Sequence, residues 1–179
     1  GDEELLSSIN FFLKKYNKKL WLSLDKSTEM NQENLKQLRY LTNVKKLKII
    51  VFNGFIEDLS ELSHINDLEE FTIYDNVKKG ISLAPLAKFK NLSFLSLYTG
   101  LTIRQYTVLN TFEKLEHLSA REIDFSKLNN LPIKELTANS KLIHSDLIAE
   151  KFADIEYISL QNCKDVHIEN IHSLGYILS

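Results

Sequence analysis

The chain has 179 residues, of which 44% are hydrophobic and 26% charged, and its formal net charge is −2. This length and composition are typical of one soluble globular domain or one array of repeats. The small net charge gives no electrostatic drive toward nucleic acid or an anionic membrane surface, and no apolar run approaches the roughly 20 residues of a transmembrane helix. The single cysteine excludes an internal disulfide and fits a reducing compartment.

The first segment, residues 1–16, has the spacing of an amphipathic helix. Its apolar side chains recur at helical intervals, at Leu5, Leu6, Ile9, Phe12, Leu13 and Tyr16. The acidic residues 2–4 precede them, where the positive end of a helix dipole favours carboxylates. We expect this helix to cap the first open edge of the fold, and the alternative is a helix that binds a partner.

A strand and a helical segment come next. Leu20–Leu24 alternates apolar and polar residues, which predicts a strand with one buried face. Residues 27–41 are predicted to be mostly helical, because their leucines fall on one side of a helix. Further along, one or two helical turns are expected at Ala84–Phe89 and at Asp146–Lys151.

The rest of the chain repeats one apolar phrase. Leu68-x-x-Phe71-x-Ile73 recurs 24 residues later as Leu92-x-x-Leu95-x-Leu97. Related phrases begin at Asn17, Val44, Leu115, Ile133, Ile155 and Leu174, at spacings between 18 and 27 residues. Apolar side chains at the first, fourth and sixth positions predict a short strand with one buried face. Such a unit buries that face only by stacking on its neighbours.

The shortest spacing, between Leu115 and Ile133, leaves little chain for the return to the next strand. We expect residues 123–132 to follow an extended path with no helical turn. Pro132 fits this path, because proline is tolerated at the start of a strand.

The pattern L-x-x-L-x-L, recurring about every 20–29 residues, resembles the leucine-rich repeat family. The resemblance implies an α/β fold: a right-handed solenoid with a curved parallel β-sheet on its concave face and loops and short helices on its convex face. It covers residues 17–179 as about seven to eight irregular repeats, with residues 1–16 as an N-terminal capping helix. Ile56–Leu62 and Ile81–Leu86 are similar to the short bacterial, internalin-like repeat.

The ninth position of the family's repeat is usually Asn or Cys, whose side chain hydrogen-bonds backbone at the turn. Only Asn76 and Cys163 match it here, so irregular turns are expected. The same match predicts that Cys163 is buried at a turn and contributes packing.

Strand alternation assigns the third, fifth and seventh positions of each repeat to the concave face. The fifth is Thr or Ser in five consecutive repeats, which predicts a low floor between two taller rows. The β-propensity of threonine and solvation of an exposed face are the simpler explanation. Exposed aromatic residues and arginine match the composition of binding hot spots. The candidate partner-binding residues are Trp21, Lys48, Tyr74, Phe94, Tyr98, His117, Arg121 and Tyr157.

Two groups of side chains contain residue types that occur in catalytic or metal sites. Ser96, Ser119, His117 and Glu135 supply the residue types of a nucleophile, base and carboxylate, but adjacent parallel strands provide no oxyanion hole. His144, Asp146, Cys163, Asp165, His167 and His172 lack the paired spacing of a zinc site. We therefore expect neither an enzyme nor a metal or other cofactor.

The resemblance implies a non-enzymatic protein–protein interaction module that binds a protein partner on its concave face, without nucleic acid and without insertion into a membrane. Two settings compete: an intracellular toxin-neutralising protein of the immunity type, and a secreted internalin-like surface adhesin. A cytoplasmic location is favoured, and secretion would require a signal peptide removed before Gly1. A weak homodimer through Leu174–Ser179 is also predicted, because a final strand exposes unpaired backbone groups.

Overall fold

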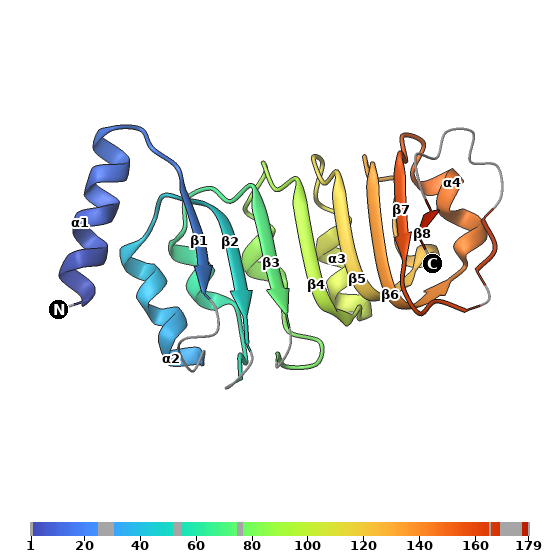
Figure 1. Cartoon of the computed structure of the whole chain (residues 1–179), viewed down its shortest axis with the longest axis horizontal. Coiled ribbons are helices and arrows are strands. Elements are labelled where there is room, and N and C mark those ends of the chain that lie inside the picture. The colour runs from blue at the N-terminus through green and yellow to red at the C-terminus, as the bar shows by residue number, and fades with distance from the viewer. Residues whose placement is uncertain are drawn as a thin grey trace.

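The computed structural model describes residues 2–24, 31–51, 55–74, 77–164, 166–168 and 177–178. In this part of the chain the strands form one open, all-parallel sheet whose order in space is the order in sequence (Figure 1). The strands are β1 (Leu20–Leu24), β2 (Val44–Ile50), β3 (Glu70–Tyr74), β4 (Phe94–Gly100), β5 (His117–Asp124), β6 (Glu135–Ile143), β7 (Tyr157–Leu160) and the two-residue β8 (Ile177–Leu178). The chain thus has an α/β fold in which each strand pairs with its sequence neighbours.

The repeated apolar phrase explains the register of the sheet. The fourth positions of successive phrases are direct cross-strand partners, and all are essentially inaccessible to solvent: Leu47, Phe71, Leu95, Leu118, Leu136 and Ile158. The sixth positions form a second buried row two residues further along each strand. Removing one such Leu or Phe side chain from water contributes about 1.5–3 kcal/mol, so these rows fix both the buried face and the pairing.

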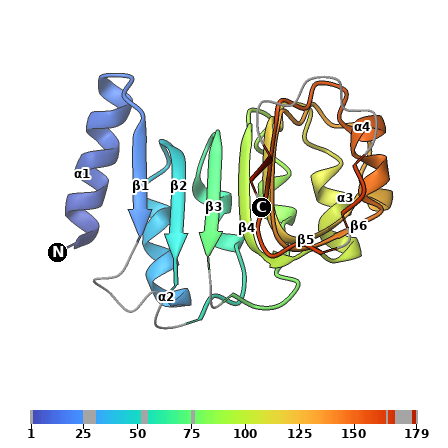
Figure 2. The ribbon, with the colours of Figure 1, turned by 45° about the vertical axis from the view of Figure 1, so that its right-hand side comes forward.

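Short helical segments return the chain to the next strand, and they all lie on one side of the sheet (Figure 2). They are α2 (Gln32–Leu35), η1 (Lys36–Tyr40), η2 (Ser60–His64), η3 (Ala84–Leu86), α3 (Ile103–Leu109), η4 (Phe125–Lys127), η5 (Ser145–Leu147) and α4 (Ile148–Lys151). Their apolar side chains, such as Leu35, Leu62 and Leu109, complete the core between the two layers. The predicted helical turns within 27–41, 84–89 and 146–151 are confirmed for the described residues.

The short return between β5 and β6 corrects one expectation. An extended path without a helical turn was predicted for residues 123–132, but η4 forms a 3₁₀ turn there. The Asp124 side chain accepts a hydrogen bond from Ser126 N at 3.0 Å, and Phe125 is buried with its ring centroid 5.8 Å from that of Phe152. A 3₁₀ turn uses few residues per turn, so the short segment accommodates one.

The predicted N-terminal helix is present as α1 (Asp2–Lys15), which lies beside β1 at the end of the sheet (Figure 1). Leu13 is buried, and Asn10 Oδ1 accepts from Thr42 N at 3.0 Å. The predicted apolar face is only half covered, because Phe12 and Tyr16 are each 53% exposed. Neither α1 nor any other helix of the described residues is long and apolar enough to cross a membrane.

Ion pairs join the amino ends of the first strands. Lys45, just inside β2, pairs with Asp67 and with Glu69 Oε1 at 3.4 Å, and Lys19 Nζ lies 3.0 Å from the same Glu69 oxygen. Lys45 is the most buried of these cations, with a side chain 22% exposed. These pairs join neighbouring strands at their amino ends, and the largest of the three depressions described below lies toward the carboxyl ends.

Candidate functional site

The sheet face opposite the helical segments, here called the open face, carries the third, fifth and seventh positions of each phrase. The register aligns the predicted floor directly, as Thr72, Ser96, Ser119, Thr137 and Ser159. Ser96 is only 2% exposed and Ser159 only 8%. The floor is therefore largely covered by the taller side chains on either side of it.

The third positions form a row that contains two groups of contacting side chains. Lys46 Nζ lies 5.4 Å from the Trp21 ring and pairs with Glu70. Further along, the rings of Phe94 and His117 stack with centroids 4.0 Å apart and planes 11° apart. His117 Nδ1 contacts Glu135 Oε2 at 2.9 Å, and Tyr157 is the next residue in register after Glu135.

Trp21 lies two residues away from its expected register. The sequence pattern aligned it with Lys48, but its cross-strand partner is Lys46, because the β1–β2 register shifts between Leu20 and Trp21. Trp21 therefore belongs to the third-position row and is 71% exposed at its end. A displacement of two residues keeps a side chain on the same face of the sheet, so alternation alone does not reveal it.

The seventh positions and Lys48 form a second row, in which two adjacent tyrosine rings lie between two cations. Lys48 Nζ lies 5.8 Å from the Tyr74 ring, the Tyr74 and Tyr98 centroids are 5.8 Å apart, and Arg121 lies 5.6 Å from the Tyr98 ring. Each cation–π contact contributes about 0.5–1 kcal/mol at an exposed site. These contacts hold the side chains in defined orientations without any partner.

Two bulges set the direction of Arg121. On one side, Ala120 and Glu122 pair with Leu97 and Gly100, so two residues of β4 oppose the single Arg121. On the other side, the same two β5 residues pair with Ala138 and Lys141 of β6, so two residues again oppose one. Bulges bend a strand and re-aim its side chains, and here they surround the one arginine of the site.

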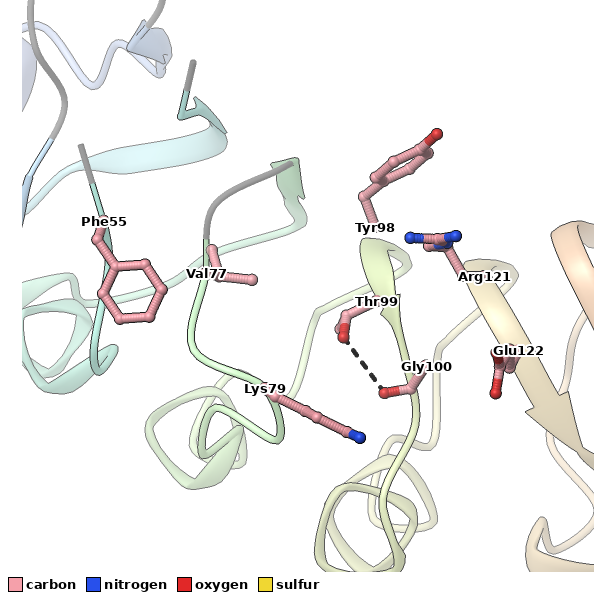
Figure 3. A pocket seen from close by; sticks show the side chains of 8 residues that line it. All are labelled: Phe55, Val77, Lys79, Tyr98, Thr99, Gly100, Arg121 and Glu122. Carbon is pink, nitrogen blue, oxygen red and sulfur yellow. Dashed lines mark hydrogen bonds between the residues drawn. The ribbon is translucent and has the colours of Figure 1, made fainter. Parts of the chain in front are cut away.

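Three depressions mark this part of the molecule. One of about 200 Å³ lies between the two rows and is lined by Trp21, Lys46, Leu47, Lys48, Glu70, Thr72, Tyr74 and Phe94. A second, of about 190 Å³, is lined by Tyr74, Leu97, Tyr98, Ser119, Ala120, Thr137, Asn139 and Gln161. A third, of about 490 Å³, lies at the carboxyl ends of β3–β5 and includes Tyr98 and Arg121 (Figure 3).

Alternation on the strands misses part of this site. Phe55, Val77 and Lys79 line the third depression but lie in return segments, beyond the strand ends. Lys46 and Glu70 occupy third positions but were not among the candidate binding residues. The sequence does contain a signal for their contact, since opposite charges at equivalent positions of adjacent phrases indicate a cross-strand ion pair.

The constellation weighed as catalytic is only partly assembled. Ser96 and Ser119 are register neighbours, and the imidazole of His117 is held between Phe94 and Glu135. Ser96 is almost fully buried, and its hydroxyl lies 3.5 Å from Tyr74 Oη.

The residues weighed as metal ligands do not converge where the structure describes them. No group of three or more His, Cys, Asp or Glu side chains suited to an ion occurs in the described ranges. His144 Nδ1 lies 2.9 Å from Asp124 Oδ1. Burial opposes ionisation of Asp124, but hydrogen bonds from Ser126 and His144 outweigh it and lower the pKa of this carboxyl.

Cys163 is half-buried rather than buried. Its Sγ lies 3.7 Å from the Ala138 carbonyl oxygen and 3.5 Å from that of Gln161. The side chain packs against the edge of the core, as expected for the ninth position. The predicted dimer segment Leu174–Ser179 lies outside the described residues except for β8, whose Ile177 and Leu178 are in register with Ile158 and Ser159.

The chain matches no protein-family model, no curated protein and no solved structure. The candidate site therefore stands on its own geometry: two rows of interacting side chains, a low hydroxyl floor between them and three adjoining depressions.

Proposed function

We propose that the protein is a non-enzymatic binding module of the leucine-rich repeat type, which binds a protein partner across the open face. The repeat assignment is supported by strands that pair in chain order and by the buried rows at the fourth and sixth positions of each phrase. The assignment of a binding role is supported by the side chains of the opposite face.

The observation that carries the proposal is the pair of rows on the open face. Trp21, Phe94, Tyr74 and Tyr98 with Arg121 concentrate the residue types that dominate binding energy at protein interfaces. Their stacking and cation–π contacts reduce the freedom that would otherwise be lost on binding. A partner covering both rows would bury the aromatic surface that they expose.

The same face supports a role without catalysis. The imidazole of His117 lies flat against Phe94, and Glu135 engages its Nδ1. Ser96 is 2% exposed, so a substrate carbonyl has little access to its hydroxyl. The stacked and paired histidine is better suited to presenting a fixed surface than to moving a proton to a nucleophile.

The test is affinity capture from the source organism with three forms of the protein. Trp21→Ala/Phe94→Ala removes two aromatic side chains of the open face, and Phe11→Ala/Ile103→Ala removes two exposed apolar side chains elsewhere. A hot-spot truncation costs about 2 kcal/mol, or roughly thirtyfold in affinity. The partner is expected to be retained by wild type and by the Phe11/Ile103 variant and lost by the open-face variant.

Two outcomes contradict the proposal. Capture of the same partner by wild type and by the Trp21/Phe94 variant would show that the open face is not the binding surface. Loss of the partner only in the Phe11/Ile103 variant would move the site to α1 or α3, in line with the alternative role of the first helix as a partner-binding element. Circular dichroism of each variant verifies that the fold is retained.

A further inference from the structure

A depression of about 490 Å³ lies where β3–β5 end, at the margin of the open face. Figure 3 shows Phe55 and Val77 on one side of it, Tyr98 and Arg121 on the other, and the Lys79 side chain extended below them. Thr99, Gly100 and Glu122 complete the lining. The depression thus has an apolar wall and a cationic wall that face each other.

The apolar wall is fixed by backbone pairing. Ile56 forms an isolated parallel bridge with Val77, and Lys78 N donates to Ile56 O at 2.9 Å. Phe55 is 47% exposed and lines the depression. A large apolar side chain held half exposed beside a hollow is a ready contact surface for an apolar ligand group.

The cationic wall is fixed by the turn at Gly80 and by the bulges of β4 and β6. Gly80 has φ +68°, and a Cβ there would lie 3.1 Å from Thr102 Cγ2, so this turn packs closely on the next unit and sets the path of Lys79. Arg121, opposed by two residues on each side, lies over the Tyr98 ring. Both cations are therefore presented by constrained backbone.

The charges of the described lining residues do not cancel. Among them, Lys79 and Arg121 supply two positive charges and Glu122 one negative charge, a net charge of +1. No ion pair joins Lys79 or Arg121 to another of the described residues. The Glu122 carboxylate lies against Gly100, where an added Cβ would be 3.3 Å from Glu122 Oε2. The lining therefore has one positive charge available for a ligand.

We infer that this depression receives a carboxylate side chain and an adjacent apolar side chain of the protein partner. The carboxylate lies between Arg121 and Lys79, where the guanidinium can donate two parallel hydrogen bonds to it. The apolar neighbour packs on Phe55 and Val77. A single carboxylate matches the net charge of the described lining residues, whereas a phosphate dianion adds a second negative charge beside Glu122. This inference rests on the proposed function, because it names one anchor of the partner bound there.

The experiment titrates the ¹⁵N-labelled protein with three probes and follows the backbone amides by NMR. The probes are the blocked dipeptide acetyl-Leu-Glu-amide, its uncharged analogue acetyl-Leu-Gln-amide, and inorganic phosphate. The glutamate peptide is expected to give saturable shifts at Phe55, Gly100 and Glu122, with Kd in the millimolar range, about −4 kcal/mol. The glutamine peptide is expected to bind about fivefold more weakly, as for loss of one exposed ion pair.

Variants assign the effect to the cationic wall. Lys79→Gln is expected to remove the difference between the two peptides, whereas Lys90→Gln, which neutralises an exposed lysine on another return segment, is expected to preserve it. Raising the salt concentration from 50 to 500 mM is expected to weaken the glutamate peptide and leave the glutamine peptide unchanged. Equal binding of the two peptides, stronger binding of phosphate, or no saturable shift with any probe would overturn the inference.

Failure of this inference is distinguishable from failure of the proposed function. If the captured partner is lost by Trp21→Ala/Phe94→Ala but retained at full affinity by Lys79→Gln, the open face binds the partner and the carboxylate anchor is wrong. If the glutamate peptide binds as expected but the Trp21→Ala/Phe94→Ala variant still captures the partner, the anchor site exists and the open-face proposal is wrong.

Discussion

Replacement of Tyr106 by Phe tests how the return segment α3 is joined to the sheet. The Tyr106 ring is 5% exposed, and its hydroxyl oxygen accepts a hydrogen bond from Asp124 N at 2.6 Å. The Phe ring retains the packing, so the substitution removes the acceptor and leaves the Asp124 N–H without it. Loss of one partner of a buried hydrogen bond costs about 1–3 kcal/mol, and we expect a loss of that size in the free energy of unfolding at pH 7.

Because of the same hydroxyl, the difference in the free energy of unfolding between the wild type and Tyr106→Phe depends on pH. Burial raises the pKa of Tyr106 from 10.0 to about 12. Because the folded pKa lies above the unfolded one, this contribution to stability is complete below pH 10 and is lost as the pH rises toward 12. At pH 12 the wild type should have lost about 2 kcal/mol relative to the Phe variant, which removes most of its advantage.

Urea unfolding followed by far-ultraviolet circular dichroism, between pH 7 and pH 12, measures both effects. Tyr16→Phe, at a residue 53% exposed in the turn just after α1, serves as the matched control and should give the stability of the wild type at pH 7. The reasoning is refuted if Tyr106→Phe is as stable as the wild type at pH 7. It is equally refuted if the two stabilities fall in parallel from pH 9 to pH 12.

Three further outcomes are expected. Burial disfavours the ionised form of Asp67, but Lys45 more than offsets this and lowers the pKa of Asp67, so its stabilising contribution is lost as the pH falls through that lowered value. Asp67→Asn should cost about 1 kcal/mol at neutral pH and flatten the acid limb measured by calorimetry; an unchanged limb contradicts this. Gly80→Ala should lower the urea midpoint by the equivalent of about 1 kcal/mol or more, because φ is +68° and the new Cβ meets Thr102; an unchanged midpoint argues against that contact. Cys163 should react more slowly with a thiol reagent in the folded protein than in urea, and equal rates would show that its half-buried position gives no protection.

The sheet was predictable because one apolar phrase recurs with a nearly constant period. Phe71 and Leu95 occupy equivalent positions of successive phrases, and the structure makes them direct cross-strand partners. Burial of one face allows no slip by a single residue, since such a slip would turn every apolar side chain toward solvent. The alignment of Thr72 with Ser96 on the opposite face follows from the same constraint.

The bulges were not predicted, although the sequence carries a trace of them. Ala120 and Ile123, both buried on β5, are separated by one residue fewer than Ala138 and Leu142, their counterparts on β6. That difference in spacing is the bulge. Alternation assigns a residue to a face only until an extra residue intervenes. The position of Arg121 between two bulges could therefore not be predicted from the sequence pattern.

The carboxylate anchor could not be foreseen from strand patterns. Phe55 and Lys79 lie in return segments, where neither helical nor strand periodicity assigns a direction to a side chain. Their positions depend on the Ile56–Val77 bridge and on the turn at Gly80, both of which are contacts between different units. Of the lining residues, only the strand residues Tyr98 and Arg121 were already among the candidates.

The chain-order arrangement of β1–β8 has a consequence for how the protein can change. Each strand makes its sheet hydrogen bonds only with strands adjacent in sequence, so a unit such as residues 92–114 meets the rest of the sheet at two junctions. A duplicated or exchanged unit therefore needs to pair and pack only with the strands at those two junctions. New recognition surfaces can therefore arise by recombination of whole units, while the buried rows preserve the pairing and the open-face side chains vary independently.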